Sequence, residues 1–232
     1  APLFNFQYER QIWLNSFLAI ICFCLISSSI YLLNDSIDYK QDKIHPRKKY
    51  RPIASNKISI KFALIFSSFL LATSLFLAFI TSKYLALILI LYWIIQFFYC
   101  TYLKNIVLLD IFCIASGFIL RASAGLIAPS LPNSPWFILS IGLLALYLAI
   151  EKRKAELNRS LKTNIITRKV LKNYSIPLLL RLESLVGTSS FITYSLWASG
   201  PLLKGAKSSW MMLTIPFVLF GIFRYQLISD FE

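Results

Sequence analysis

The chain has 232 residues, of which 57% are hydrophobic and only 15% are charged, and its mean hydropathy is +0.66. A water-soluble fold could not bury this much apolar surface, whereas a lipid bilayer accommodates it. The net charge of +14 would suggest nucleic-acid binding in a soluble protein, but here the basic residues lie in a few loops between apolar runs. We therefore expect them to set membrane topology and to bind anions, and we expect no nucleic-acid partner.

Seven apolar stretches are candidate membrane-spanning helices, since a bilayer core of about 30 Å needs about 20 helical residues. In chain order they are residues 12–33, 60–82, 84–103, 107–128, 135–151, 176–199 and 209–228. Pro135 suits the first turn of the fifth and shortest stretch. Only Lys83 separates the second stretch from the third, which indicates a tight turn. The sequence thus predicts an all-α, polytopic transmembrane helical bundle.

The four cysteines lie within or at the edges of these stretches, at Cys22, Cys24, Cys100 and Cys113. Their spacing is not that of a metal site, and nothing in it indicates a disulfide framework. We expect them to be small apolar side chains of the helix packing.

The basic residues predict the orientation of the bundle. Eight lie in residues 34–61, nine lie in residues 151–181, and Lys104 and Arg224 stand alone. With seven spans, these four places fall on one side of the membrane, which carries nineteen basic residues against four on the other. The positive-inside rule makes that side cytoplasmic, with Arg121 left over inside the fourth stretch.

An acidic motif follows the first span. Asp35, Asp38 and Asp42 are spaced i, i+3, i+7, so they share one face if the helix continues past Leu33. Three carboxylates on one stripe at a helix C-terminus repel one another and are disfavoured by the helix dipole, which suggests a compensating cation. Mg²⁺ fits because it binds oxygen ligands and bridges carboxylates to phosphates, and Asn34 could add an amide oxygen.

A basic segment comes directly after the acidic motif. Arg47, Lys48 and Arg51 could hold the phosphate oxygens that the metal leaves free. The alternative is a solvated loop in which the acids merely neutralise the bases. His45, the only histidine of the chain, is either a structural loop residue before Pro46 or a phosphate donor.

A second polar group lies around the fourth span. Tyr102 and Lys104 close the third span, and Asp110 lies among apolar residues at the start of the fourth. A carboxylate in such a place is costly unless it is paired or binds a cation. We expect Asp110 to be functional, with an ion pair to Lys104 or Arg121 as the plainer alternative.

A third polar group ends the fifth span with Lys152, Arg153 and Glu156. Arg153 and Glu156 could pair at i+3, and membrane-interface anchoring is the alternative for the whole group. Polar residues in the last two spans repeat the pattern, with Arg181 and Glu183 near the start of the sixth span and Arg224 and Tyr225 in the last one. Several border charges on one face predict a polar chamber open to the cytoplasm.

These motifs resemble those of the UbiA superfamily of intramembrane prenyltransferases. The resemblance begins with N-D-x-x-D-x-x-x-D at 34–42, followed by H-P-R-K-x-x-R-P-I-A at 45–54. Further segments resemble its decaprenyl-phosphate phosphoribosyltransferase branch, namely Tyr102–Lys104 with Asp110, 117–125, 151–157 and 216–225. The likeness implies a fold of nine transmembrane helices, so this chain of one domain, 1–232, is expected to lack the first and last helices.

The resemblance also implies an activity. It is the Mg²⁺-dependent transfer of 5-phosphoribose from phosphoribosyl pyrophosphate to a polyprenyl phosphate lipid, at the cytoplasmic face of a bacterial inner membrane. Asp35, Asp38 and Asp42 would bind the metal, and Asp38, Lys104 and Asp110 would act in catalysis. The remaining candidates would bind substrate, and they are Asn34, Arg47, Lys48, Arg51, Tyr102, Arg121, Lys152, Arg153, Glu156, Arg224 and Tyr225. Association into a homo-oligomer is left open.

Two other functions compete with this one. A UbiA-type prenyltransferase would move an isoprenoid from its diphosphate to an aromatic acceptor such as 4-hydroxybenzoate. Such enzymes carry a second Asp-rich motif, whereas the corresponding stretch here offers Lys104 and the single Asp110. The lysine suits an additional phosphate, which favours phosphoribose. A small transporter with a cytoplasmic anion site is the other alternative, but inverted repeats and broken spans are not visible.

Overall fold

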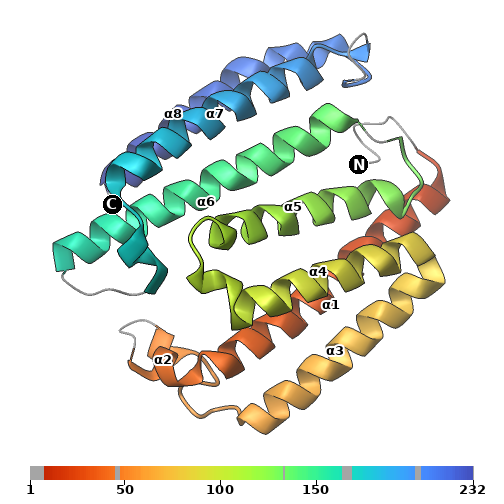
Figure 1. The fold of residues 1–232 in the computed structure, drawn as a ribbon. Coiled ribbons are helices and arrows are strands. Elements are labelled where there is room, and N and C mark those ends of the chain that lie inside the picture. The colour runs from red at the N-terminus through yellow and green to blue at the C-terminus, as the bar shows by residue number, and fades with distance from the viewer. Residues whose placement is uncertain (1–7, 45–47, 133, 164–168, 202–204, 232) are drawn as a thin grey trace. The chain divides into compact units, whose positions relative to one another are not determined.

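The computed structural model describes residues 8–44, 48–132, 134–163, 169–201 and 205–231, and these residues form helices and connecting turns without strands (Figure 1). His45 and Arg47 lie outside the described residues. The chain divides into two compact units. The N-terminal unit comprises Tyr8–Leu103 and Ala124–Ser130, and the C-terminal unit comprises Lys104–Ser123 and the described residues from Leu131 onward.

The N-terminal unit is built on three long helices. In chain order its elements are α1 (Arg10–Ile37), α2 (Tyr39–Ile44), the 3-10 turn η2 (Lys48–Tyr50), α3 (Ile60–Thr81) and α4 (Lys83–Thr101). Helix α1 packs against α3 and α4. The expected tight turn falls on Ser82, whose extended backbone ends α3 and whose hydroxyl accepts the N–H of Tyr84 in α4.

Small and hydroxyl-bearing residues form the interface between α1 and α3. The Ser67 hydroxyl donates to the Ser29 carbonyl at 2.9 Å, and the Ser74 hydroxyl donates to the Cys22 carbonyl at 2.8 Å. All four of these residues are buried. Small residues let helix backbones approach closely in a membrane, where packing and interhelical hydrogen bonds replace the hydrophobic effect.

The C-terminal unit holds the remaining helices. They are most of α5 (Leu109–Ile127), then α6 (Pro135–Thr163), η4 (Lys169–Asn173), α7 (Ile176–Ala198), η6 (Ser209–Thr214) and α8 (Ile215–Phe231). Helix α6 packs along α7, and α8 contacts both. A buried cluster around Ile111, Ile150, Leu171, Tyr174 and Leu179 joins α5, α6, η4 and α7.

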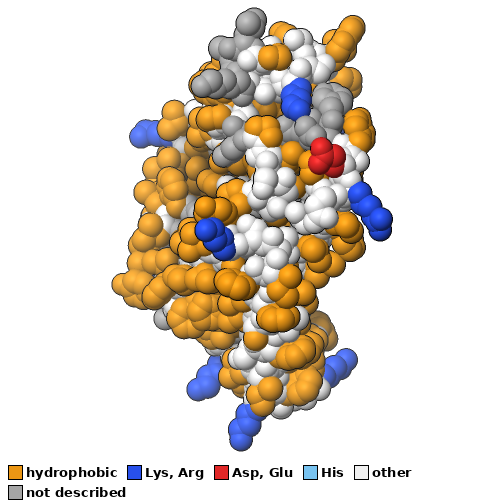
Figure 2. Space-filling view, turned by 90° about the vertical axis from the view of Figure 1, so that its right-hand side faces the viewer, with side chains coloured by type: hydrophobic (Ala, Val, Ile, Leu, Met, Phe, Trp, Pro, Cys, Tyr) orange, Lys and Arg blue, Asp and Glu red, His pale blue; other side chains and the backbone are white. Residues whose placement is uncertain are grey.

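The predicted membrane class agrees with the helices. Within the described residues, six are long and apolar enough to cross a bilayer, namely α1, α3, α4, α5, α6 and the η6–α8 segment. The predicted span 176–199 forms α7 but is not among these six. Its charged residues Arg181 and Glu183 and its many serines and threonines make it less apolar. Many large hydrophobic side chains are exposed along these helices, and the face in Figure 2 shows hydrophobic side chains with a few separated charges.

Two details refine the sequence predictions. Helix α6 runs to Thr163 rather than ending near residue 151, so its polar part is a continuous helical extension of the span. The cysteines are all free, and three are buried, whereas Cys24 is exposed. The expectation of cysteines as small buried side chains is therefore confirmed for Cys22, Cys100 and Cys113.

Candidate functional site

Two carboxylates of the acidic motif converge in the N-terminal unit. Asp35 lies in the last turns of α1, and Asp42 lies in α2 with its residue only 3% exposed. The Arg51 Nη1 atom donates to Asp35 Oδ1 at 2.7 Å and to Asp42 Oδ2 at 2.8 Å. A single guanidinium nitrogen therefore lies between the two carboxylates, so both can contact a cation at this point.

The segment after η2 fixes the position of Arg51. The Arg51 carbonyl accepts the Ser55 N–H, and the Pro52 carbonyl accepts the Lys57 N–H, while Ile53 and Ala54 are buried. Lys48 adds a second cation, with its Nζ atom 3.9 Å from Asp42 Oδ1. The basic segment thus folds back on the acids, and the phosphate-binding roles of Lys48 and Arg51 stay predictions.

The acidic stripe does not lie on one uninterrupted helix. Helix α1 continues past Leu33 but ends at Ile37, and Asp38 is its C-cap, with its N–H donating to the Asn34 carbonyl. Helix α2 then starts at Tyr39. Among the residues that the structure describes, no three Asp, Glu, His or Cys side chains gather closely enough to hold a metal ion. The structure therefore brings Asp35 and Asp42 together, and the metal role of Asp38 stays a prediction.

Asp110 lies in a buried charged cluster of the C-terminal unit. Asp110 and Arg153 are both fully buried, and Arg153 Nε donates to Asp110 Oδ2 at 2.6 Å. Arg153 Nη1 also donates to Glu156 Oε2, which confirms the i, i+3 pair. The structure pairs Asp110 with Arg153, 43 residues away on α6, a partner that the sequence analysis had not named beside Lys104 and Arg121.

Tyr174, which the sequence did not single out, completes this cluster. Its hydroxyl donates to Asp110 Oδ1 at 2.7 Å and accepts the Leu108 N–H at 2.9 Å. Burial, followed by the hydrogen bond to Asp110, raises the pKa of the Tyr174 phenol above its ordinary range. The phenol therefore remains a neutral donor at physiological pH.

A further buried network joins the last three helices. Lys154 Nζ lies 2.6 Å from Glu183 Oε2, 3.2 Å from Glu151 Oε2 and 2.9 Å from Asp230 Oδ1. Gln226 donates to the other Glu183 oxygen at 2.9 Å. One ammonium thus links carboxylates from α6, α7 and α8. This network was not predicted from the sequence, and the i, i+3 spacing of Glu151 and Lys154 is the one sequence signal for it.

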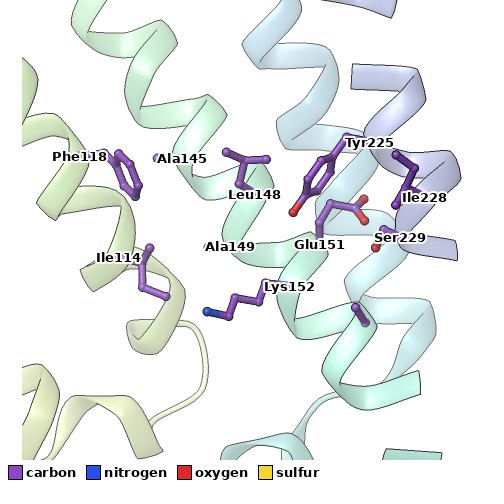
Figure 3. Close-up of a pocket in the computed structure, with 11 residues that line it drawn as sticks. Ile114, Phe118, Ala145, Leu148, Ala149, Glu151, Lys152, Tyr225, Ile228 and Ser229 are labelled. Atoms are coloured by element: carbon purple, nitrogen blue, oxygen red, sulfur yellow. The ribbon is translucent and has the colours of Figure 1, made fainter. Parts of the chain in front are cut away.

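A pocket of about 390 Å³ lies between α5, α6 and α8 (Figure 3). Its walls are apolar on α5, from Ile114 and Phe118, while Glu151 and Lys152 of α6 and Tyr225 of α8 supply polar groups. Two of the predicted substrate-binding residues, Lys152 and Tyr225, therefore line one cavity. In Figure 3 the Lys152 side chain extends on the α5 side of the cavity, whereas Glu151 lies on the α8 side.

The other predicted site residues are distributed along the helices. Tyr102 is the exposed C-cap of α4, and Lys104 lies in the 3-10 turn η3 (Leu103–Asn105). Arg121 is in α5 with its guanidinium 5.4 Å from the centre of the Phe118 ring. Arg224 is an exposed residue of α8. Substrate roles for these four residues stay predictions.

Comparisons with known proteins give a consistent picture. The family model of the UbiA prenyltransferase family matches residues 7–231. The chain is 36% identical to the decaprenyl-phosphate phosphoribosyltransferase of Mycolicibacterium smegmatis, covering 91% of this chain and 69% of that one. It is 34% identical to the protein of the same name from Mycobacterium tuberculosis, covering 92% and 70%.

The fold has a solved counterpart as well. The structure of a UbiA homolog from Archaeoglobus fulgidus bound to GPP and Mg²⁺ matches with a TM-score of 0.77 at 18% identity, covering 95% of this chain and 76% of that one. At this identity the likeness establishes the shared helical architecture.

Proposed function

Because the chain belongs to the UbiA prenyltransferase family, we propose that it transfers 5-phosphoribose from phosphoribosyl pyrophosphate to decaprenyl phosphate or a similar polyprenyl phosphate, releasing pyrophosphate. The observation that carries this proposal is the 36% identity over 91% of the chain with a decaprenyl-phosphate phosphoribosyltransferase. The protein is an integral membrane protein and a transferase. Placement in a bacterial inner membrane, with the site facing the cytoplasm, follows from the basic loops and is part of the proposal.

The convergent pair Asp35 and Asp42 fits Mg²⁺. This ion is usually held by one or two carboxylates and completes its shell with water and substrate phosphate oxygens. The Arg51 nitrogen between the two carboxylates supports the fit, because it shows that a cation is accommodated there. When bound, Mg²⁺ would supply neutralisation of the charge that develops on the departing pyrophosphate.

The residues of the N-terminal unit would bind the donor. Asp35 and Asp42 supply acceptor oxygens for the metal, while Arg51 and Lys48 supply N–H donors for the phosphate oxygens that remain. When the donor binds, Arg51 would pair with a phosphate instead of the two carboxylates, and the metal would take its place beside them. The carboxylates and the phosphates would then each have a cation close by. A donor with a diphosphate and a second phosphate therefore matches the alternation of acids and bases from 34 to 51.

The chemistry requires little proton transfer. A phosphate oxygen of the polyprenyl phosphate forms a bond to C1 of the ribose, and the bond from C1 to the diphosphate breaks, so the anomer is inverted and pyrophosphate leaves. The acceptor is already an anion and needs no strong general base. In the C-terminal unit, Lys152 lines the pocket and would bind a phosphate there, and the catalytic role of Asp110 stays a prediction. A reaction that needs no strong general base agrees with the single histidine of the chain.

The test is transfer in reconstituted vesicles. Vesicles containing the protein and decaprenyl phosphate are incubated with phosphoribosyl pyrophosphate labelled in the ribose, with Mg²⁺ or with excess EDTA. We expect a labelled lipid that forms only with Mg²⁺. No labelled lipid, together with product from a prenyl diphosphate and 4-hydroxybenzoate, would replace this proposal with aromatic prenyl transfer. Anion flux without either product would indicate a transporter.

A further inference from the structure

Tyr174 is anchored by its ring in the core of the C-terminal unit. It follows η4 and precedes Ser175, whose hydroxyl caps α7. The residue is 6% exposed, and it belongs to the buried cluster that includes Ile111 of α5 and Ile150 of α6. A ring packed in this way leaves the hydroxyl little freedom, so the hydroxyl position is set by the core.

The hydroxyl makes two hydrogen bonds of different kinds. Its single proton goes to Asp110 Oδ1 at 2.7 Å, and its oxygen receives the Leu108 N–H at 2.9 Å. A tyrosine hydroxyl can donate once and accept, so both capacities are used. Tyr174 therefore holds both the Asp110 side chain and the backbone at Leu108, two residues before it.

The backbone position at Leu108 is strained. Leu108 has a φ of 68°, in the left-handed region that a residue with a branched apolar side chain rarely occupies. Such conformations persist where the surrounding structure imposes them, and they are concentrated at functional sites. The Leu108 carbonyl accepts the N–H groups of Ile111 and Phe112, so this residue also starts α5. The direction in which α5 presents Asp110 depends on Leu108.

The effect passes on to Arg153. Asp110 Oδ2 accepts the Arg153 Nε–H at 2.6 Å, and Arg153 Nη1 donates to Glu156. A carboxylate with one oxygen held by a phenol and the other by a guanidinium has a fixed plane. If the phenol is removed, Asp110 can rotate, and the guanidinium that it orients can rotate with it.

We propose that Tyr174 is a positioning residue for the phosphoribosyl transfer, which fixes the orientation of Asp110 and Arg153 through its contacts to Leu108 and to Asp110. The inference rests on the proposed function for its kinetic part and on the geometry alone for its structural part. Tyr174 contacts no substrate in this account, and it acts through Asp110.

The kinetic experiment compares Tyr174→Phe with wild type and with a matched control. Tyr92→Phe is the control, because Tyr92 is 3% exposed and its hydroxyl is hydrogen-bonded to Ser27 Oγ at 3.2 Å in the N-terminal unit. We expect Tyr174→Phe to lower kcat/KM for phosphoribosyl pyrophosphate roughly tenfold or more, as loss of supporting contacts usually does. Tyr92→Phe should stay within about twofold of wild type at a comparable change in Tm.

A second measurement does not depend on activity. Hydrogen exchange of the peptide that covers residues 104–112 reports the Leu108 amide and the first turn of α5. Tyr174→Phe should accelerate exchange in this peptide and leave the 135–150 part of α6 unchanged. Leu108→Gly in the Tyr174→Phe background should restore part of the protection and part of the rate, since glycine occupies the left-handed region without strain.

The outcomes separate the two proposals. A folded Tyr174→Phe protein with wild-type kcat and KM for the donor overturns the positioning role. If wild-type protein forms no labelled lipid, the proposed function fails, and exchange alone decides on Tyr174. In that case unchanged exchange at 104–112 overturns the inference, whereas faster exchange that Leu108→Gly partly reverses supports it.

Discussion

At the scale of single residues, Asp42 is the most informative position of the acidic pair. It is almost fully buried, it contacts Arg51 at 2.8 Å, and Lys48 lies 3.9 Å away. Burial of a carboxylate is costly unless cations lie beside it, and Arg51 and Lys48 lie beside Asp42. Asp42 is therefore expected to act both in the folded protein and in binding of the metal and donor.

We predict that Asp42→Asn lowers the transfer rate by at least roughly 10–100-fold, which is the usual cost of losing a supporting contact at a metal site. The concentration of Mg²⁺ required for half-maximal activity should rise, because one anionic ligand has become neutral. A Mg²⁺ titration of the labelled-lipid assay measures both effects. Glu9→Gln, at the exposed start of α1, serves as the control. An unchanged Mg²⁺ requirement in Asp42→Asn would remove Asp42 from the metal site.

The buried pair of Asp110 and Arg153 gives a second prediction at this scale. Arg153→Met leaves the fully buried Asp110 without its guanidinium, which we expect to destabilise the protein by about 3–5 kcal/mol. Adding Asp110→Asn removes the uncompensated charge, so the double variant should be more stable than Arg153→Met alone. Thermal unfolding in detergent measures this difference.

Activity provides the complementary readout for the same variants. The double variant should regain stability without regaining transfer, since neither group of the pair is present. If the double variant loses as much stability as the Arg153→Met and Asp110→Asn variants lose together, a direct interaction between Asp110 and Arg153 is contradicted.

Sequence patterns identified many of these residues but not their partners. The cost of a carboxylate in an apolar helix pointed to Asp110, and the i, i+3 spacing pointed to the pair of Arg153 and Glu156. The contact between Asp110 and Arg153 spans 43 residues of chain, and Tyr174 lies in a connection with no motif of its own. Which distant side chains meet depends on how α5, α6 and η4 pack, and periodicity along one helix does not contain that information.

At the scale of elements, the Lys154 network determines how the last three helices pack. Its ammonium contacts Glu183 of α7 and Asp230 of α8 as well as Glu151 of its own helix. In a membrane the hydrophobic effect does not drive helices together, so polar contacts between helices carry more of the specificity. Lys154 is thus expected to act as a structural residue, although it lies between the candidate site residues Arg153 and Glu156.

We predict that Lys154→Met destabilises the protein by roughly 3–5 kcal/mol, because buried carboxylates lose their shared cation. Lys162→Met is the matched control on the same helix, since Lys162 is exposed near the end of α6, and its effect should stay within about 0.5 kcal/mol. Thermal unfolding monitored by size-exclusion chromatography of detergent-solubilised protein compares the two. Equal Tm values for both variants would show that the network does not stabilise the helix packing.

Helix ends show where prediction by hydropathy fails. The apolar stretch 135–151 becomes a helix that ends only at Thr163, because charged residues from 151 to 162 are good helix formers even though they are not apolar. Conversely, α1 was expected to carry all three aspartates if it continued, and it breaks at Asp38. Hydropathy therefore locates the part of a helix that lies in lipid, and the local backbone geometry decides where the helix stops.

At the scale of the whole molecule, the distribution of basic residues predicts which loops face the cytoplasm. Residues 34–61 and 151–181 carry most of the lysines and arginines, whereas the turn at Lys83 and the connection containing Lys207 carry few. This assignment requires that α7 crosses the membrane, although α7 is less apolar than the six helices that qualify by length and composition. The side of the membrane on which Lys172 and Lys207 lie therefore tests α7 directly, because these residues flank it.

We predict that single cysteines placed on opposite sides of the membrane differ in their labelling. In a background in which Cys22, Cys24, Cys100 and Cys113 are replaced by alanine, Lys83→Cys and Lys207→Cys should react with a membrane-impermeant maleimide in intact spheroplasts. Lys57→Cys and Lys172→Cys should react only after permeabilisation, since the positive-inside rule places them in the cytoplasm. Labelling of Lys172→Cys and Lys207→Cys from the same side would show that α7 does not span the bilayer. Labelling of Lys57→Cys from outside would place the acidic pair on the wrong side for a phosphoribosyl donor made in the cytoplasm.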